Sequence, residues 1–321
     1  MRRFLAFVVL GLVLTSGAFA PVQAQYPTKP VRIIVPFPPG GPVDGVARQV
    51  AQRLAEATGQ NFLVENRAGG NSAIGSDAVA KSAPDGYTLL INASIFAINP
   101  HLVKVPYDIQ KDFTPVALLA KGPLVITVTP GLEAKDVAAL IAYGRANPGK
   151  LAFAIGSNGS AGHLSTELFK RQAGLDLLIV PYKGSTPAYA DLMSGQIQGF
   201  IEPVLGALPL IKSGRIRALA VTSSKPLGAL PGVRTVAETG LPGFEFYVWY
   251  GLWGPAGLPK DALDRLNAEA NRVLASPAMR ERFEQQGFET QTGSPEAFAK
   301  FVRDDSALSA RIIREVGIKA E

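Results

Sequence analysis

The clearest indication of the fold is residues 31–42, Val31-Arg32-Ile33-Ile34-Val35-Pro36-Phe37-Pro38-Pro39-Gly40-Gly41-Pro42. Its first five residues are rich in β-branched side chains, which favours a strand that ends at Pro36. A loop of proline and glycine follows. From Val43 to Thr58 apolar residues recur at helical spacing, and Gly59 is a typical helix stop. A strand, a glycine-rich loop and a helix in this order indicate an α/β unit with a largely parallel sheet.

The same rhythm repeats along the 321 residues. The pattern predicts further strands at 62–65, 87–91, 124–128, 151–155, 177–180, 197–201 and 216–221. It predicts further helices at 74–81, 133–146, 163–172 and 187–193, and helical stripes from 263 to the end. Two α/β units fit the usual domain size, and the chain is expected to cross between them near 123–127 and 247–251. A plain division into N-terminal and C-terminal halves is the alternative.

The N-terminus has the features of a secretory signal peptide. A basic start, Met1–Arg3, precedes an apolar run from Phe4 to Leu14, and Val22-Gln23-Ala24 fits the small-x-small cleavage pattern. The apolar run is too short for a membrane span. We therefore expect residues 1–24 to be removed after Ala24 and the protein to be exported, and an N-terminal membrane anchor is the alternative.

Composition and charge exclude several classes of function. The chain has no cysteine and two histidines, so it has no disulfide scaffold, thiolate site or multi-histidine metal cage. The net charge is +6, and removal of Arg2 and Arg3 leaves 30 Lys and Arg against 26 Asp and Glu, or +4. No block of basic residues stands clear of acids, which argues against nucleic-acid binding. The mild positive surplus favours a small anionic ligand. We expect no metal and no cofactor.

Four glycine-rich loops lie between a predicted strand and a helix start. They are residues 38–42, 67–72, 156–162 and 183–186. A helix N-terminus carries free N–H groups and a partial positive charge, and glycine lets a ligand approach the backbone. Such loops lie at the carboxyl ends of the strands, where α/β proteins bind ligands, and they can hold a carboxylate without arginine. Ordinary turn chemistry is the alternative for each loop taken alone.

Other motifs have weaker support. Asn158-Gly159-Ser160-Ala161-Gly162 differs from the G-x-S-x-G elbow of hydrolases at its first glycine, and no histidine follows His163. A secreted serine hydrolase that uses Ser160 is therefore the rival class. His163 and Glu167 share a helix face, either as an ordinary side-chain pair or as a metal pair. Asp44 is expected to cap or support the first helix. No dinucleotide or P-loop glycine motif is present.

Several segments together resemble the substrate-binding proteins of tripartite tricarboxylate transporters, the Bug family. The resemblance covers essentially the whole mature chain. It rests on Tyr26 to Gly41 with Asp44 and Ala47-Arg48, and on Glu65-Asn66-Arg67-Ala68-Gly69-Gly70, Pro84-Asp85-Gly86-Tyr87-Thr88-Leu89-Leu90, Pro106-Tyr107-Asp108, Gly159-Ser160 to His163-Leu164, Pro181-Tyr182-Lys183-Gly184 and Ala237-Glu238-Thr239-Gly240-Leu241-Pro242-Gly243.

The resemblance implies an α/β, two-lobed periplasmic binding protein of type II-like fold, with the ligand cleft between the lobes. Residues 25–124 and 250–321 would form lobe 1, and residues 125–249 would form lobe 2. The protein would be a non-enzymatic monomer that captures a small carboxylate in the periplasm and delivers it to a membrane permease. The implied ligand-binding residues are Phe37, Pro39, Gly40, Gly41, Asp44, Ser94, Ser157, Asn158, Gly159, Ser160, His163, Tyr182, Lys183, Gly184, Glu202, Pro203 and Val204.

The sequence departs from the family pattern at Glu202, where an aspartate is usual. A longer acid in the cleft would repel a second ligand carboxylate unless it is protonated or paired, and it could instead favour an amine or a hydroxyl. Two questions stay open at this stage. The sequence does not identify the carboxylate, and it does not separate a transport protein from a binder that serves a sensor.

Overall fold

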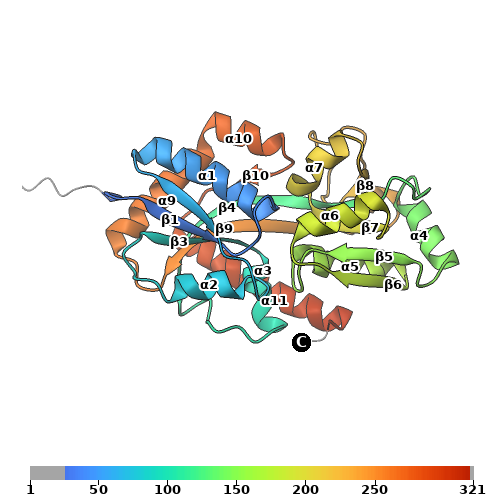
Figure 1. The fold of residues 1–321 in the computed structure, drawn as a ribbon, viewed down its shortest axis with the longest axis horizontal. Helices are drawn as coiled ribbons and strands as arrows, with labels where there is room; N and C mark the ends of the chain where they lie inside the picture. The colour runs from blue at the N-terminus through green and yellow to red at the C-terminus, as the bar shows by residue number, and fades with distance from the viewer. Residues whose placement is uncertain (1–25, 319–321) are drawn as a thin grey trace, which may run out of the picture.

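A computed structural model describes residues 26–318 of the chain. The predicted signal peptide, residues 1–24, lies outside the described residues. Two lobes lie side by side, joined by two long strands (Figure 1). Within residues 26–318, no helix combines the length and the apolar character that a membrane span needs.

Lobe 1 is built on three parallel strands, with β1 between its two neighbours. A strand buried on both faces needs an apolar sequence, which explains the β-branched run 31–35. The parallel strands of this lobe are β1 (Val31–Val35), β2 (Phe62–Asn66) and β3 (Thr88–Ala93). Its helices are α1 (Pro42–Thr58), α2 (Ala73–Ala80), α3 (Ile95–Ile98), α9 (Lys260–Ala275), α10 (Pro277–Glu284) and α11 (Pro295–Val316), with the short helix η1 (Asn99–His101).

Lobe 2 repeats the plan with β5 (Leu151–Ile155) between the parallel strands β6 (Leu177–Pro181) and β7 (Gly199–Pro203). A fourth strand, β8 (Arg217–Val221), pairs with the connecting strand β4 (Phe113–Val128). The helices of this lobe are α4 (Val137–Ala146), α5 (Ala161–Ala173), α6 (Ser185–Ser194), α7 (Val204–Lys212) and α8 (Val236–Thr239).

Two antiparallel strands connect the lobes. β4 (Phe113–Val128) and β9 (Tyr247–Pro255) pair from Phe113 opposite Pro255 to Pro123 opposite Tyr247. Near its middle β4 also pairs with β10 (Glu289–Thr290) in lobe 1 through Ala120 and Lys121, and at its end it pairs with β7 in lobe 2. The strand order β2-β1-β3-β9-β4-β7-β5-β6 therefore runs through both lobes as one curled sheet. The predicted crossing points, 123–127 and 247–251, fall within β4 and β9, and the lobe boundaries stay a prediction.

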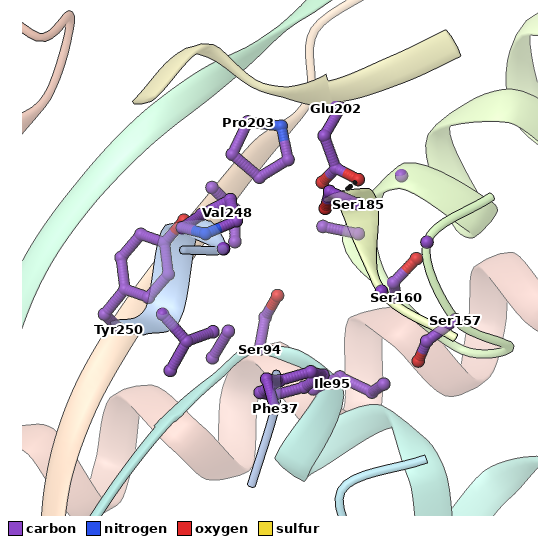
Figure 2. Close-up of a pocket in the computed structure, with 18 of the residues that line it drawn as sticks. Phe37, Ser94, Ile95, Ser157, Ser160, Ser185, Glu202, Pro203, Val248 and Tyr250 are labelled. Atoms are coloured by element: carbon purple, nitrogen blue, oxygen red, sulfur yellow. Dashed lines mark hydrogen bonds between the residues drawn. The ribbon is translucent and has the colours of Figure 1, made fainter. Parts of the chain in front are cut away.

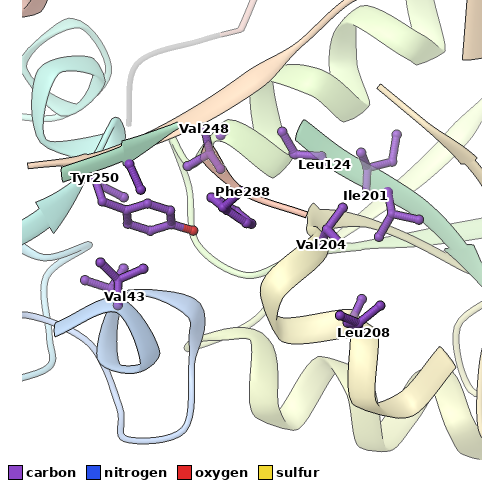
Figure 3. Close-up of a cluster of buried hydrophobic side chains, with 14 of the residues drawn as sticks. Val43, Leu124, Ile201, Val204, Leu208, Val248, Tyr250 and Phe288 are labelled. Atoms are coloured by element: carbon purple, nitrogen blue, oxygen red, sulfur yellow. The ribbon is translucent and has the colours of Figure 1, made fainter. Parts of the chain in front are cut away.

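The buried core continues from one lobe to the other at the back of the cleft (Figure 3). Val43 from α1, Val248 and Tyr250 from β9, and Val204 and Leu208 from α7 belong to one cluster of buried side chains. Across the cleft the lobes also touch. A Cβ added to Gly184 would lie 3.3 Å from Pro38, and one added to Gly159 would lie 3.0 Å from Asn99. The lobes are therefore closed on each other.

Most predicted elements are confirmed, and three need correction. The strand predicted at 124–128 is only the end of the 16-residue β4. The helix predicted from 133 begins at Val137, because the Asp136 side chain accepts a hydrogen bond from the Ala139 N–H and caps it. The strand predicted at 197–201 runs from Gly199 to Pro203, two residues later. The α/β class and the two-lobed architecture are as the sequence predicts.

Candidate functional site

A cavity lies between the two lobes, with about 600 Å³ of atom-free space that is partly open to solvent. The part of this space that can hold the centre of a water-sized sphere is about 70 Å³, so the closed cavity has room for a small molecule only. The segments that line it follow the carboxyl ends of β1, β3, β5, β6 and β7, with β9 closing one side (Figure 2). The lining residues are Phe37, Pro38, Gly41, Pro42, Val43, Ala93, Ser94, Ile95, Gly156, Ser157, Ser160, Ala161, Gly162, Gly184, Ser185, Thr186, Glu202, Pro203, Val248 and Tyr250.

Several helices begin at this cavity. The lining contains the first residues of α1, α3, α5 and α6 and the residue that precedes α7. The N–H groups in the first turn of a helix have no partner within the helix, and the helix dipole places a partial positive charge there. No Lys, Arg or His occurs among the described residues of the lining. The backbone N–H groups at these helix starts are therefore the positively polarised groups available to a ligand.

The two lobes contribute different surfaces, which we call the lobe 1 wall (Phe37–Val43 and Ala93–Ile95) and the lobe 2 wall (Gly156–Gly162, Gly184–Thr186 and Glu202–Pro203). In the lobe 1 wall, Ser94 is the one lining residue with a polar side chain. The lobe 2 wall has five polar side chains in the lining: Ser157, Ser160, Ser185, Thr186 and Glu202. A ligand in the cavity would meet an apolar surface on one side and hydroxyl groups on the other.

Three hydroxyl groups of the cavity are buried without a hydrogen-bond partner among the described residues. They belong to Ser94, Ser157 and Tyr250. A buried polar group without a partner costs free energy, so proteins rarely leave several in one place. Together with the helix N-termini, these hydroxyls form a set of donors that a bound anion with oxygen atoms would satisfy.

Among the described residues that line the cavity, Glu202 is the one with a carboxyl group, and it is 6% exposed. Its Oε2 accepts a hydrogen bond of 2.8 Å from the Ser185 hydroxyl, drawn as a dashed line in Figure 2. Burial raises the pKa of Glu202 to about 8, although the Ser185 hydrogen bond acts in the opposite direction. The acid is therefore mostly neutral at pH 7.

Asp44 lies behind the first glycine loop and outside the cavity lining. Its carboxylate accepts hydrogen bonds from the Gly40 N–H at 3.0 Å, from Arg48 at 2.9 Å and from Asn66 at 2.9 Å. Burial acts to raise the pKa of Asp44, but these bonds outweigh burial and hold it below its ordinary value. Asp44 fixes the shape of the loop at Gly40 and Gly41, and so positions the start of α1.

His163 has a similar supporting place in lobe 2. Its Nδ1 accepts a hydrogen bond of 3.0 Å from the Gly159 N–H, and its Nε2 lies 3.9 Å from Glu167. The Ser160 hydroxyl accepts a hydrogen bond of 3.1 Å from the His163 backbone N–H and caps α5. Gly159 adopts φ +72°, which favours glycine there. Ser160 is thus a helix cap with its side chain at the cavity edge, and the His163 ring holds the preceding loop.

The structure brings eight of the predicted ligand-binding residues together in the lining: Phe37, Gly41, Ser94, Ser157, Ser160, Gly184, Glu202 and Pro203. It places seven others outside the lining: Pro39, Gly40, Asp44, Asn158, Gly159, His163 and Val204. Val204 belongs instead to the buried cluster of Figure 3, because its side chain points into the junction between the lobes.

Tyr182 and Lys183 line a neighbouring groove. The groove shares Phe37, Ser157 and Gly184 with the cavity, so the two are adjacent along the same walls. The predicted glycine loop 67–72 also lies on this groove, through residues 68–72. The Tyr182 hydroxyl donates a 2.5 Å hydrogen bond to Asp191, which fixes the ring beside the groove.

Two pairs of lining residues are absent from the predicted ligand-binding residues. Val248 and Tyr250 line the cavity from the connecting strand β9, and Ser185 and Thr186 line it from the start of α6. A signal for the first pair was available, since a strand that crosses between two lobes must pass along the cleft between them. Ser185 and Thr186 lie in the fourth glycine-rich loop and follow Gly184 directly.

Comparisons with known proteins agree on one family. The model of the tripartite tricarboxylate transporter family receptor matches residues 46–318. Protein BugT of Bordetella pertussis is 41% identical over 324 residues, covering 99% of each chain. Among solved structures, an R. palustris protein with adipate has a TM-score of 0.90 at 37% identity, covering 92% of this chain and 99% of its own.

Two further structures extend the comparison. The periplasmic binding protein BugD has a TM-score of 0.87 at 34% identity, covering 92% of this chain and all of its own. MatC from Rhodopseudomonas palustris, with bound malate, has a TM-score of 0.82 at 30% identity, covering 90% of this chain and all of its own. With a two-lobed fold, a cavity between the lobes and these matches over nearly the whole length, the chain belongs to the tripartite tricarboxylate transporter receptor family of solute-binding proteins.

Proposed function

We propose that this protein is a periplasmic, non-enzymatic binding protein that captures a small carboxylate between its lobes and delivers it to a permease of the tripartite tricarboxylate type. One observation carries the proposal. Helix N-termini and three unpartnered hydroxyls, those of Ser94, Ser157 and Tyr250, meet in one cavity without any basic side chain in the described lining. Such a site suits an anion that accepts several hydrogen bonds. The relatives solved with adipate and with malate support the carboxylate class.

Binding is coupled to closure of the lobes. The cavity takes residues from both lobes and from β9, so a ligand completes its contacts only when the lobes meet. In the open form the unpartnered hydroxyls would be hydrated, and in the closed form the ligand replaces that water. The ligand therefore stabilises the closed form by its extra contacts there. The closed monomer then presents a surface from both lobes to the permease.

Calorimetry with a panel of mono-, di- and tricarboxylates tests the proposal, with the matching uncharged amides as controls. We expect at least one carboxylate to bind, and its amide to bind much more weakly. Absence of binding by every carboxylate would contradict the proposal. Small-angle scattering of the free and the bound protein tests closure, because the bound form is expected to be the more compact.

Two experiments separate this function from its rivals. A hydrolase would cleave ester substrates and lose that activity in Ser160→Ala, whereas the binding protein shows no turnover in either form. Deletion of the gene should abolish uptake of the bound carboxylate into cells, and a plasmid copy should restore it. Normal uptake in the deletion strain, together with loss of a transcriptional response to the ligand, would assign the protein to a sensor instead.

A further inference from the structure

Glu202 stands apart from the other polar groups of the cavity because it is an acid in a site built for an anion. Its carboxyl group faces the cavity beside Ser185 (Figure 2). A Cβ added to Gly156 would lie 2.9 Å from its Oε2, so the carboxyl packs closely against the backbone of the loop before α5. That loop belongs to the lobe 2 wall, and the ligand is expected to lie against it.

Among residues 26–318, no cation faces this carboxyl from any element packed against it. Ser185 and Tyr189 lie on the α6 side, Tyr250 lies on β9, and the loop before α5 presents Gly156. Glu202 forms none of the salt bridges found within residues 26–318. Burial of an ionised carboxylate without a cation is expensive, so the group keeps its proton instead.

A bound anion would favour the protonated form of Glu202 still further. An ionised Glu202 would place a second negative charge in a cavity that already holds the ligand carboxylate, and two like charges in one site raise the pKa of one of them. The neutral acid can instead donate a hydrogen bond, as the nearby Tyr250 hydroxyl can. An ammonium group on the ligand would have the opposite effect, because it would pair with the ionised form.

The inference rests on the proposed function. We infer that Glu202 carries its proton in the ligand complex and acts as a hydrogen-bond donor, so that the pocket selects carboxylates without an amino group and couples their binding to a proton. Glu202 is then a specificity-determining residue. Amino acids, which carry an ammonium group beside the carboxylate, are rejected because the pocket offers their ammonium group no negative charge.

Two matched pairs of ligands test the selectivity. Adipate is compared with 2-aminoadipate, and malate with aspartate, by calorimetry near pH 7. We expect the amino-free member of a pair to bind at least about tenfold more tightly, which corresponds to ~1.4 kcal/mol. Tighter binding of either amino acid than of its partner would overturn the inference and leave the proposed function intact. Failure of every carboxylate in the wider panel would instead contradict the proposed function itself.

The pH dependence gives a second test of the same claim. For the wild type, affinity for the amino-free ligand should fall about tenfold for each pH unit above the pKa of the free protein's Glu202. Titrations in two buffers of different ionisation enthalpy should show uptake of close to one proton at about pH 9. Affinity that stays constant or rises with pH over this range would overturn the inference.

Glu202→Gln removes the titrating group and keeps a donor. Its affinity should be the same at about pH 7 and about pH 9, so at the higher pH it should bind more tightly than the wild type, with no proton uptake. Glu133→Gln changes an exposed acid and is the matched control. Complete loss of binding in Glu202→Gln, with a folded protein by circular dichroism, would show that the ligand needs the ionised carboxylate.

A ligand-free measurement keeps the inference testable if none of the four probes binds. Infrared difference spectra at neutral pH should contain the carbonyl band of a protonated carboxylic acid in the wild type. This band should be absent from Glu202→Gln and present in Glu133→Gln. Its absence from the wild type would overturn the inference.

Discussion

The two walls of the cavity differ in polarity. The lobe 1 wall is apolar apart from Ser94, whereas the lobe 2 wall carries five polar side chains, including Glu202. A flexible open form would therefore hold the ligand first on the lobe 2 wall, which supplies most of the hydrogen-bond donors. Lobe 1 would then cover the ligand and exclude water. Under the proposed function, one lobe would therefore recognise the ligand and the other would close the site.

The largest effect on ligand binding is expected from Gly162→Ala, which displaces the lobe 2 wall. A Cβ at this position would lie 2.5 Å from the Ile201 carbonyl oxygen, so the start of α5 cannot stay packed against β7. We expect about 2 kcal/mol lower stability in urea unfolding and loss of carboxylate binding by calorimetry. Gly131→Ala is the control, since its Cβ would meet nothing within 4 Å. Unchanged affinity in Gly162→Ala would show that α5 does not hold the ligand.

The second prediction is that the free energy of unfolding falls with rising pH because of Glu202. Its pKa is about 8 in the folded protein, against an ordinary value of 4.5. Between these values the unfolded chain has released the proton while the folded chain keeps it, so stability falls as pH rises. The fall is up to ~1.4 kcal/mol per pH unit, and it levels off above the folded pKa. Urea unfolding of the wild type and Glu202→Gln across this range should show the fall as a difference between the two. Parallel curves would mean that Glu202 is ionised when folded.

A smaller effect is expected from Ser157→Ala on the lobe 2 wall. The Ser157 hydroxyl has no partner among the described residues, so its loss should leave the stability of the free protein unchanged or slightly raised. Binding should weaken about tenfold for every carboxylate, because a hydrogen bond to a charged group is lost. A loss of stability with unchanged binding would instead make Ser157 a structural residue.

The smallest effect is expected from Phe37→Ala on the lobe 1 wall. Phe37 is partly buried and covers the cavity without a polar contact to offer. We expect about fivefold weaker binding, seen mainly as faster dissociation in stopped-flow fluorescence, because the cover over the ligand is reduced. Slower association with an unchanged dissociation rate would indicate that lobe 1 takes part in the first encounter.

The sequence predicts which loops form the two walls better than it predicts which side chains of those loops face the cavity. Strand, glycine loop and helix start are local signals, so the loops at Gly41, Ser157 and Gly184 could be assigned to one cleft. Asp44 and His163 are conspicuous in the sequence, yet both side chains turn back to hold loop N–H groups. Which way a side chain turns depends on long-range packing that a local pattern does not encode.

Tyr250 lines the cavity although no local sequence pattern indicates it. It comes 46 residues after the last predicted site residue, Val204, and enters the cavity because β9 runs back between β3 and β4. Similarly, the residue type at 202 signals an acid in the cleft, but its protonation depends on burial and on the absence of a cation among its described neighbours. Both conditions arise from the tertiary structure.

A crystal structure of the complex with the tightest-binding carboxylate of the panel would show which of the two walls holds the ligand carboxylate. We predict that the ligand carboxylate lies on the lobe 2 wall, within hydrogen-bond distance of Ser157 and of N–H groups at the start of α5. Its carbon skeleton should lie against Phe37 and Ile95 of the lobe 1 wall. A carboxylate against the lobe 1 wall, or a ligand bound outside this cavity, would contradict the account.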